Sequence, residues 1–314
     1  MLFRYFALVC LCLMTYGLTW AQGRGQAAAV WVVAPENGAA YREVIDALRT
    51  ETDKSAAVQW VVITPESLRT SNPGTASVPK LVVAVGHSAF ASVVAYYKGQ
   101  PNAPPIVATL LPSRAFEREL HLSGSGLKAT AVLLDQPAAR QAALIRAAFP
   151  RAKQVGLLIG ADSHHQVGAM SDALSNVGLT VNIGDVRTKG LLPALQGVLD
   201  SSDVLLGIAD PSVYSGETIT SILTAGYRRR VPLVAFSPAY VKAGALLGLY
   251  TSPTQVGLAA AAIVHAGLRG APLPPPRSPS DFSIEVNTTV ARSMGFALDA
   301  DELRKQLHEK GAAQ

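Results

Sequence analysis

Short apolar runs alternate with amphipathic, helix-like stretches along most of the chain. The apolar runs form two series of four, residues 30–34, 59–63, 81–85 and 106–110, then 154–159, 180–186, 203–208 and 231–236. Helical patterns occupy the gaps, for instance residues 39–51, 136–148, 166–177 and 212–229. Continuous apolar strands separated by helices are typical of parallel sheets covered on both faces. The pattern therefore predicts an α/β protein of two doubly wound, Rossmann-like lobes.

The order of the runs predicts where each lobe begins and ends. Lobe 1 is expected at residues 22–128 and lobe 2 at residues 129–244, with residues 129–135 as the first crossing. Residues 245–314 are expected to hold the later crossings, at 245–250 and 282–287, a proline-rich connector at 271–279 and C-terminal helices. Segments near 245–270 are candidates to complete lobe 1. Residues 64–80 are short for a full helical crossover, so a trimmed first lobe with an altered pocket is expected.

Residues 1–21 have the pattern of an export signal. Arg4 supplies a positive start, residues 5–18 are uncharged and largely apolar, and residues 19–21 offer a small-residue cleavage site. The apolar run is shorter than the roughly 20 residues that span a bilayer, which favours cleavage over a retained membrane anchor. Both cysteines, Cys10 and Cys12, lie in this segment. The mature chain is therefore expected to be periplasmic and free of thiols.

Charge and short motifs argue against several classes of function. Arg4 is the one charged residue among residues 1–21, so signal removal lowers the formal net charge from +5 to +4, too little to favour nucleic acid. His164 and His165 are adjacent, so their side chains would point in different directions, and no zinc-binding spacing accompanies them. No glycine-rich phosphate-binding loop occurs. We therefore expect no metal and no cofactor.

Polar residues at the ends of the predicted strands are the candidate binding residues. In parallel α/β sheets, ligands bind where the strands end and the helices begin. These junctions and the helices that follow them supply Glu36, Asn37, Gly86, His87 and Ser88 in lobe 1, and Asp162, Ser163, His164, Asp210, Ser212, Tyr214 and Ser237 in lobe 2. A serine or aspartate there also suits a helix cap, so no single position is diagnostic. The set as a whole predicts one cleft between the lobes, suited to a carboxylate or another anion.

An enzymatic alternative rests on Ser88. Residues 86–90 approximate the G-x-S-x-G turn that exposes the nucleophile of α/β-hydrolases, and Asp210 and His265 follow in the required order. Phe90, however, replaces the second glycine, and His265 falls within a helical pattern instead of a loop. These features make a serine hydrolase the weaker hypothesis.

Several motifs lie in the last third of the chain: Ile-Ala-Asp-Pro at 208–211, Val-Pro-Leu-Val at 231–234, Val-Lys-Ala-Gly-Ala at 241–245, and the spaced Asn287, Ala291 and Gly295. Together they resemble the ABC-transporter substrate-binding proteins whose studied members take up aromatic amino acids such as tryptophan. The resemblance is good over residues 203–307, fair over 126–160 and thin before that.

The resemblance implies a type I periplasmic-binding-protein fold, in which a three-strand hinge joins two lobes that capture a solute reversibly without chemistry. Asp210 matches the family's cleft aspartate, which would meet a ligand amino group, and Gly86 matches the glycine of the first-lobe binding loop. His87 stands where the family usually has threonine, with Ser88 as the nearest hydroxyl, and Pro211 stands where it often has asparagine.

A small polar solute, an amino acid or a similar molecule, is therefore the expected ligand of a protein expected to be monomeric. The expected partners are the permease and ATPase of an ABC transporter. An exported two-lobed protein can instead report occupancy to a membrane sensor, and this alternative stays open.

Overall fold

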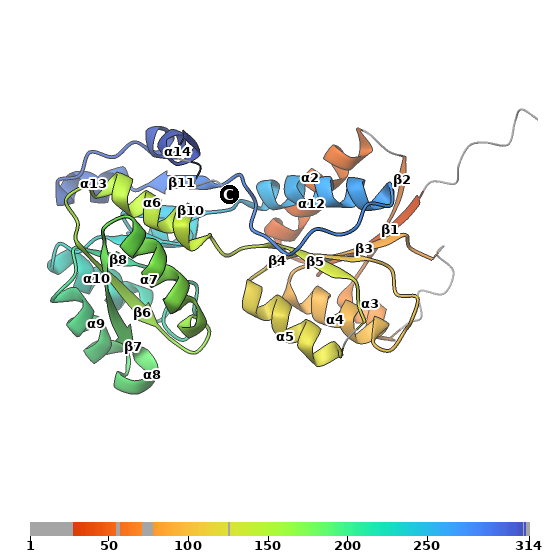
Figure 1. Cartoon of the computed structure of the whole chain (residues 1–314), viewed down its shortest axis with the longest axis horizontal. Coiled ribbons are helices and arrows are strands. Elements are labelled where there is room, and N and C mark those ends of the chain that lie inside the picture. The colour runs from red at the N-terminus through yellow and green to blue at the C-terminus, as the bar shows by residue number, and fades with distance from the viewer. Residues whose placement is uncertain (1–27, 55–56, 71–77, 125, 310, 312–314) are drawn as a thin grey trace, which may run out of the picture.

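Two lobes lie side by side in the computed structural model, which describes residues 28–54, 57–70, 78–124, 126–309 and 311 (Figure 1). Each lobe is built on its own sheet, of five strands in the first and six in the second, with helices on both faces. The predicted fold class, two doubly wound α/β lobes, is confirmed. The expected export signal lies outside the described residues.

The first lobe has an all-parallel sheet in the order β2-β1-β3-β4-β5. Its strands are valine-rich, and β3 is buried at every position because helices cover both faces of the sheet. Its elements are β1 (Ala28–Val33), α2 (Ala39–Asp53), β2 (Val58–Ile63), α3 (Pro65–Thr70), β3 (Leu81–Val85), α4 (His87–Tyr97), β4 (Ile106–Leu111), α5 (Ser113–Ser123) and β5 (Ala129–Leu133).

The second lobe has the order β11-β10-β9-β8-β6-β7, with β11 antiparallel to β10 and the other pairs parallel. Its first elements are α6 (Ala138–Ala148), β6 (Gln154–Ile159), the 3-10 turn η1 (His164–Gln166), α7 (Val167–Asn176), β7 (Thr180–Asp185), α8 (Val186–Lys189) and α9 (Leu191–Leu199). The remaining ones are β8 (Val204–Leu206), α10 (Ile219–Arg228), β9 (Leu233–Ala235), α11 (Pro238–Ala243), β10 (Leu247–Tyr250), β11 (Ser283–Val286), α13 (Thr288–Met294) and α14 (Ala300–Glu309).

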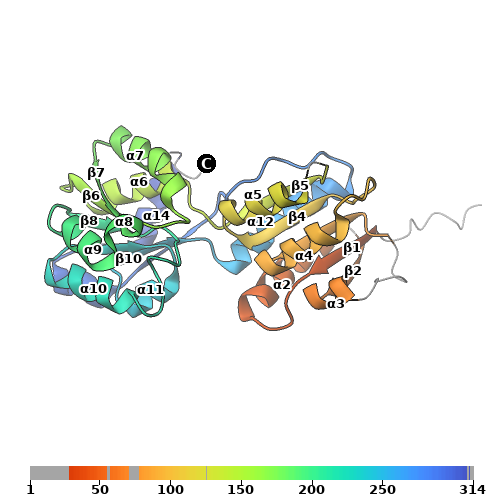
Figure 2. The ribbon, with the colours of Figure 1, turned by 90° about the horizontal axis from the view of Figure 1, so that it is seen from below.

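The chain crosses between the lobes at three places. The first crossing follows β5, so the lobe boundary falls after Leu133 and not at residues 128/129 as expected from the sequence. The second, at residues 251–252, leads from β10 into α12 (Pro253–Leu268), which packs on α2 and so completes the first lobe (Figure 2). The third runs from Arg277, which pairs with Val132 on the edge of β5, to Phe282 in the core of the second lobe.

One predicted helix begins later than expected. The pattern of residues 212–229 predicted a continuous helix, but α10 begins at Ile219. Ser215 and Thr218 bind nearby backbone instead: the Thr218 hydroxyl donates to the Val213 carbonyl at 2.7 Å and accepts the Ser215 N–H at 2.9 Å. Serine and threonine compete with helix formation in this way. None of the helices within the described residues has the length and apolar character needed to cross a membrane.

Candidate functional site

Two adjoining cavities lie between the lobes, with volumes of about 400 and about 440 Å³. Both are lined by residues of the first lobe or first crossing and by residues of the second lobe. They share part of their walls, namely Pro112, Asp135, Gln166, Ala209 and Phe236. We call the two together the inter-lobe cleft.

The smaller cavity, called the polar cavity below, carries charged side chains on both walls. The first lobe contributes His87, Arg114 and Arg118, and the second contributes Asp162 and Asp210. The His87 imidazole contacts Glu119 Oε1 at 2.8 Å, and the Arg118 guanidinium lies 3.8 Å from the same oxygen. Asp135 of the first crossing also lines this cavity, so basic and acidic groups stand together on the first-lobe side, whereas the charged groups of the second-lobe wall are acidic.

The larger cavity is mainly apolar. Its apolar lining comes from the crossings and the strand ends of the second lobe, namely Leu134, Ile208, Phe236, Pro238, Tyr250 and Pro253. The polar side chains on its wall include Gln136, Gln141 and Thr251. The cleft thus has one charged part and one apolar part.

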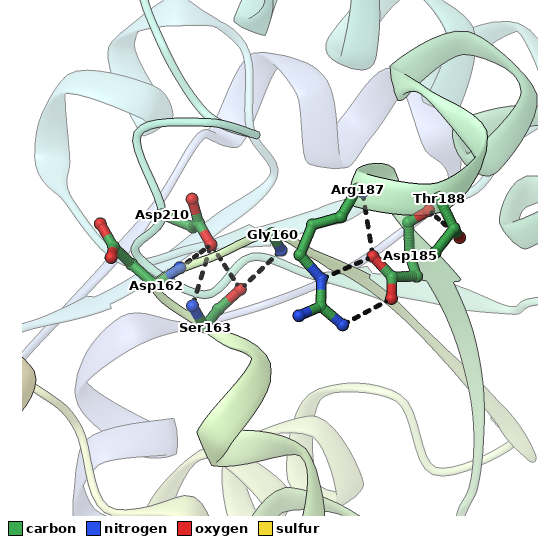
Figure 3. A network of polar contacts seen from close by, with 7 residues as sticks. All are labelled: Gly160, Asp162, Ser163, Asp185, Arg187, Thr188 and Asp210. Carbon is green, nitrogen blue, oxygen red and sulfur yellow. Dashed lines mark hydrogen bonds and ion pairs between the residues drawn. The ribbon is translucent and has the colours of Figure 1, made fainter.

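Asp210 is the buried centre of the second-lobe wall, and its carboxylate accepts five hydrogen bonds. Oδ2 accepts the N–H groups of Asp162 and Ser163, at 3.0 and 2.9 Å, and the Ser163 hydroxyl at 2.8 Å (Figure 3). Oδ1 accepts the N–H and the hydroxyl of Ser212, at 2.9 and 2.6 Å. Asp210 therefore joins the loop after β6 to the loop after β8.

These hydrogen bonds decide the ionisation of Asp210. Burial disfavours the charged form and acts to raise the pKa of Asp210, whereas the hydrogen bonds from Ser212 and Ser163 act to lower it. The hydrogen bonds outweigh burial, and the pKa lies below its ordinary value. The group is a carboxylate at neutral pH and adds negative charge to the polar cavity.

Beside Asp210, the end of β7 carries an ion pair. Arg187 donates to both oxygens of Asp185, at 3.0 and 2.7 Å (Figure 3). The hydrogen bonds that Arg187 donates lower the pKa of Asp185 to about 2, and the same bonds raise the pKa of Arg187. The charge of Asp210 acts on Arg187 in the same direction.

Gly160 permits the close contact between the two loops. A Cβ atom at this position would overlap the Ser212 hydroxyl and would lie 2.7 Å from Asp210 Oδ2. The Gly160 N–H also donates to the Ser163 hydroxyl at 3.0 Å, which aims that hydroxyl at Asp210. A residue without a side chain is required here because the carboxylate approaches the backbone directly.

Gly86 shapes the turn between β3 and α4. Its φ of 92° lies in the region that favours glycine, and a Cβ atom would lie 3.0 Å from the ring of Tyr41. The next residue, His87, begins α4 and projects into the polar cavity. Ser88 is exposed and lies outside both cavities.

An aromatic cluster supports the second-lobe wall. The buried ring of Tyr214 packs edge-on against Phe236 at 5.7 Å between centroids, and Tyr240 packs against Phe236 at 4.9 Å. The Tyr240 hydroxyl donates to the Tyr214 carbonyl at 3.1 Å. Burial raises the pKa of Tyr214, so both tyrosines are neutral and act through their rings.

Comparison with known proteins identifies the family. A sequence profile described as ABC transporter substrate binding protein matches residues 76–306, well over half of the chain. The chain belongs to this family.

Several solved structures have a similar fold at low sequence identity. A protein from Streptococcus pneumonia in complex with L-Trp is 18% identical, with 90% of this chain and 98% of that chain covered and a TM-score of 0.59. The ligand-free, open structure of a Clostridium difficile substrate binding protein is 14% identical, with coverages of 88% and 97% and a TM-score of 0.64. A search of curated protein sequences finds no match.

The structure brings several of the candidate binding residues predicted from the sequence into one cleft. His87, Asp162, Asp210 and Tyr214 line the polar cavity, and Ser237 lines the apolar one. Ser163 and Ser212 lie behind this surface and bind Asp210.

Gly86 lines neither of the described cavities, and the same holds for four further expected residues, namely Glu36, Asn37, Ser88 and His164. All four are exposed. No group of three or more potential metal ligands occurs within the described part of the chain.

Sequence reasoning missed the arginines and glutamines of the cleft. Arg114 and Arg118 lie one turn apart on α5, in the helix that follows β4, and not in the junction itself. Gln136 lies in the first crossing, and Gln166 is the last residue of η1. The i, i+4 spacing of the two arginines directly after a strand end was the one signal available.

The hydrolase hypothesis finds no geometric support. Within the described residues, no hydrogen bond connects Ser88, Asp210 and His265. The His265 ring, in α12, contacts Arg269 just beyond the helix at 2.7 Å, and the Asp210 carboxylate binds the groups described above. A nucleophile and its base need to lie within hydrogen-bond reach of each other.

Proposed function

We propose that this protein captures a small amphipathic solute in the inter-lobe cleft and delivers it to the membrane components of an ABC transporter. The observation that carries the proposal is the division of the cleft into a charged cavity and an apolar cavity that share walls. A solute with a charged end and an apolar end would satisfy both, and closure of the lobes would bury most of its surface.

The charges favour a solute with a carboxylate and an amino group. Within the described residues, the Arg114 side chain makes no hydrogen bond or ion pair, so its guanidinium is available to a carboxylate in the polar cavity. Across the cavity, the Asp162 carboxylate is exposed and similarly available to an ammonium group. Asp210 would support Asp162 by holding its backbone and adding negative charge.

The apolar cavity favours an aromatic or large aliphatic side chain. Phe236 and Tyr250 supply ring faces there, and Gln136 and Thr251 supply polar groups at its wall. The structural relative from Streptococcus pneumonia was solved with L-Trp. L-Tryptophan is therefore the first solute to test.

A thermal-shift and calorimetry screen of the purified protein tests the proposal. The panel holds L-tryptophan and other amino acids, tryptamine without the carboxylate, indole-3-propionate without the ammonium group, and sugars, peptides and purines. A solute at about 100 times its dissociation constant adds roughly 2.7 kcal/mol to the free energy of unfolding. Each kcal/mol should raise the midpoint of thermal unfolding by about 2–4 °C.

We expect a shift with an amino acid and a smaller one with each truncated analogue. A shift with sugars or purines alone would contradict the proposed solute class. No shift across the whole panel would contradict capture of a small solute and favour a protein partner.

Periplasmic location, the monomeric state and the transporter partner belong to the same proposal. Stimulation of a reconstituted permease–ATPase encoded beside this gene would support transport. Stimulation of a membrane kinase instead would favour the sensor alternative.

A further inference from the structure

A series of hydrogen bonds links all three crossings of the hinge. Gln136, in the first crossing, donates from Nε2 to Thr251 Oγ1 in the second, at 2.9 Å. Gln136 Oε1 accepts from Arg140 Nη1 at 2.8 Å. Arg140 Nη2 donates to the Pro279 carbonyl in the third crossing, at 2.9 Å. Arg140 and Gln136 thus connect segments more than a hundred positions apart in sequence.

Arg140 makes these contacts from a buried position. The residue is 1% exposed, and its guanidinium lies 4.6 Å from the centre of the Phe282 ring. Burial lowers the pKa of Arg140 to about 10, and the charge of Asp281 acts against this, so the group is protonated at neutral pH. A buried cation is costly compared with an apolar side chain of similar size. The hydrogen bonds that this guanidinium donates to the crossings explain why a buried arginine stands here in place of an apolar residue.

The same series of hydrogen bonds reaches the inter-lobe cleft. Gln136 and Thr251 both line the apolar cavity. The backbone of Gln136 is also held, because Gln141 Nε2 donates to its carbonyl at 2.8 Å. A displacement at the hinge therefore moves polar groups in the cleft wall.

Another arginine of the same helix shows what is specific to Arg140. Arg146 of α6 also binds backbone carbonyls, namely those of Val177 and Gly178, both at 2.9 Å, and those of Pro150 and Ala152. All four belong to the second lobe. Arg146 ties the helix to its own lobe, whereas Arg140 ties it to the crossings.

We infer that Arg140 is a positioning residue for the hinge: it holds Gln136 against Thr251 and Pro279, and thereby sets the angle between the lobes and the place of Gln136 in the cleft wall. This inference goes beyond solute capture and does not depend on which solute binds.

The distance between the lobes of the ligand-free protein tests it. Cys10 and Cys12 are the only cysteines, so their replacement by serine leaves a chain that accepts spin labels at Glu117→Cys on α5 and Asp172→Cys on α7, both exposed positions. Pulsed electron paramagnetic resonance then gives the distribution of inter-lobe distances. The variants are Arg140→Met, Thr251→Val and the matched control Arg146→Met.

We expect Arg140→Met to shift or broaden the distribution beyond the width found for the unsubstituted pair. Thr251→Val should change it in the same sense because it removes the acceptor for Gln136 Nε2. Arg146→Met should leave it unchanged, even if it lowers the unfolding midpoint. An unchanged distribution in folded Arg140→Met would overturn the inference, as would an equal change in Arg146→Met. If Arg140→Met fails to fold, an unchanged distribution in Thr251→Val overturns it.

Discussion

Asp210 and Ser163 are 47 positions apart in the sequence and are joined by two hydrogen bonds to one carboxylate oxygen. Ser163 donates its N–H at 2.9 Å and its hydroxyl at 2.8 Å to Asp210 Oδ2. The loops after β6 and β8 are thereby fixed to each other, and Asp162 is fixed with them because its N–H binds the same oxygen. The acidic wall of the cleft depends on this arrangement as much as on the charges themselves.

Replacing Asp210 by asparagine should destabilise the protein by on the order of 2–3 kcal/mol, because hydrogen bonds to a charged acceptor are lost and buried donors are left facing an amide. Chemical denaturation followed by circular dichroism measures the change. Asp203→Asn is the control, since Asp203 also accepts two backbone N–H groups, at 2.7 and 2.9 Å, but lies outside both cavities. Solute affinity should fall in Asp210→Asn and not in Asp203→Asn.

The ionisation of Asp210 makes part of the stability depend on pH. The pKa of Asp210 in the folded protein lies below the ordinary value of 3.8, so the unfolded chain binds more protons between the two values. This contribution is fully present above the unfolded pKa and is lost as the pH falls through the folded pKa. Asp210→Asn should therefore show a shallower loss of stability below about pH 4. Parallel acid-unfolding curves for the two proteins would contradict this.

Gly160→Ala should disrupt the same loops by a different route. The added methyl group would overlap the Ser212 hydroxyl and meet the Asp210 carboxylate at 2.7 Å, so the loops must separate or both side chains must move. We expect a cost of about 1–3 kcal/mol, the usual range for overpacking. The control is Gly168→Ala in α7, where a Cβ atom meets nothing within 4 Å and alanine favours the helix. Equal stability of the two variants would show that Gly160 is not a contact point.

The sequence was sufficient for the architecture because parallel strands buried on both faces are continuous apolar runs, as in residues 81–85. The same reasoning drew attention to Asp210 and Ser163, which lie in the loops that follow β8 and β6. It could not locate the lobe boundary to within one strand, because β5 has the same composition whether it ends one sheet or crosses to the next. The start of α10 was missed because the hydroxyls of Ser215 and Thr218 compete for the backbone.

The hinge residues could not be predicted from the sequence for a different reason. Gln136, Arg140 and Thr251 form one network only after the crossings are brought together. A buried arginine on a helix has the same appearance in sequence as an exposed one. Long-range pairing of this kind is a property of the topology and not of local pattern.

Arg114→Ala should weaken the binding of a solute that carries a carboxylate. A hydrogen bond to a charged group is worth about 1.5–3 kcal/mol, which corresponds to a loss of affinity of roughly 10- to 100-fold. Arg69→Ala on α3 is the control in the same lobe, because Arg69 pairs with Glu66 and does not line the cleft. Calorimetry with the solute found in the screen, and with its analogue lacking the carboxylate, separates the loss of a contact to the carboxylate from a general loss of binding. A loss of affinity that is equal for both solutes would place Arg114 away from the carboxylate.

Ser88→Ala should leave solute affinity and stability nearly unchanged. The hydroxyl is exposed and outside both cavities, and within the described residues neither His265 nor Asp210 is bonded to it. A serine without a neighbouring base is a weak nucleophile, so the protein should not react with a fluorophosphonate probe. Mass spectrometry of the treated protein checks this directly. Covalent labelling at Ser88 that disappears in Ser88→Ala would revive the hydrolase hypothesis, whereas its absence together with solute binding leaves reversible capture as the function of the cleft.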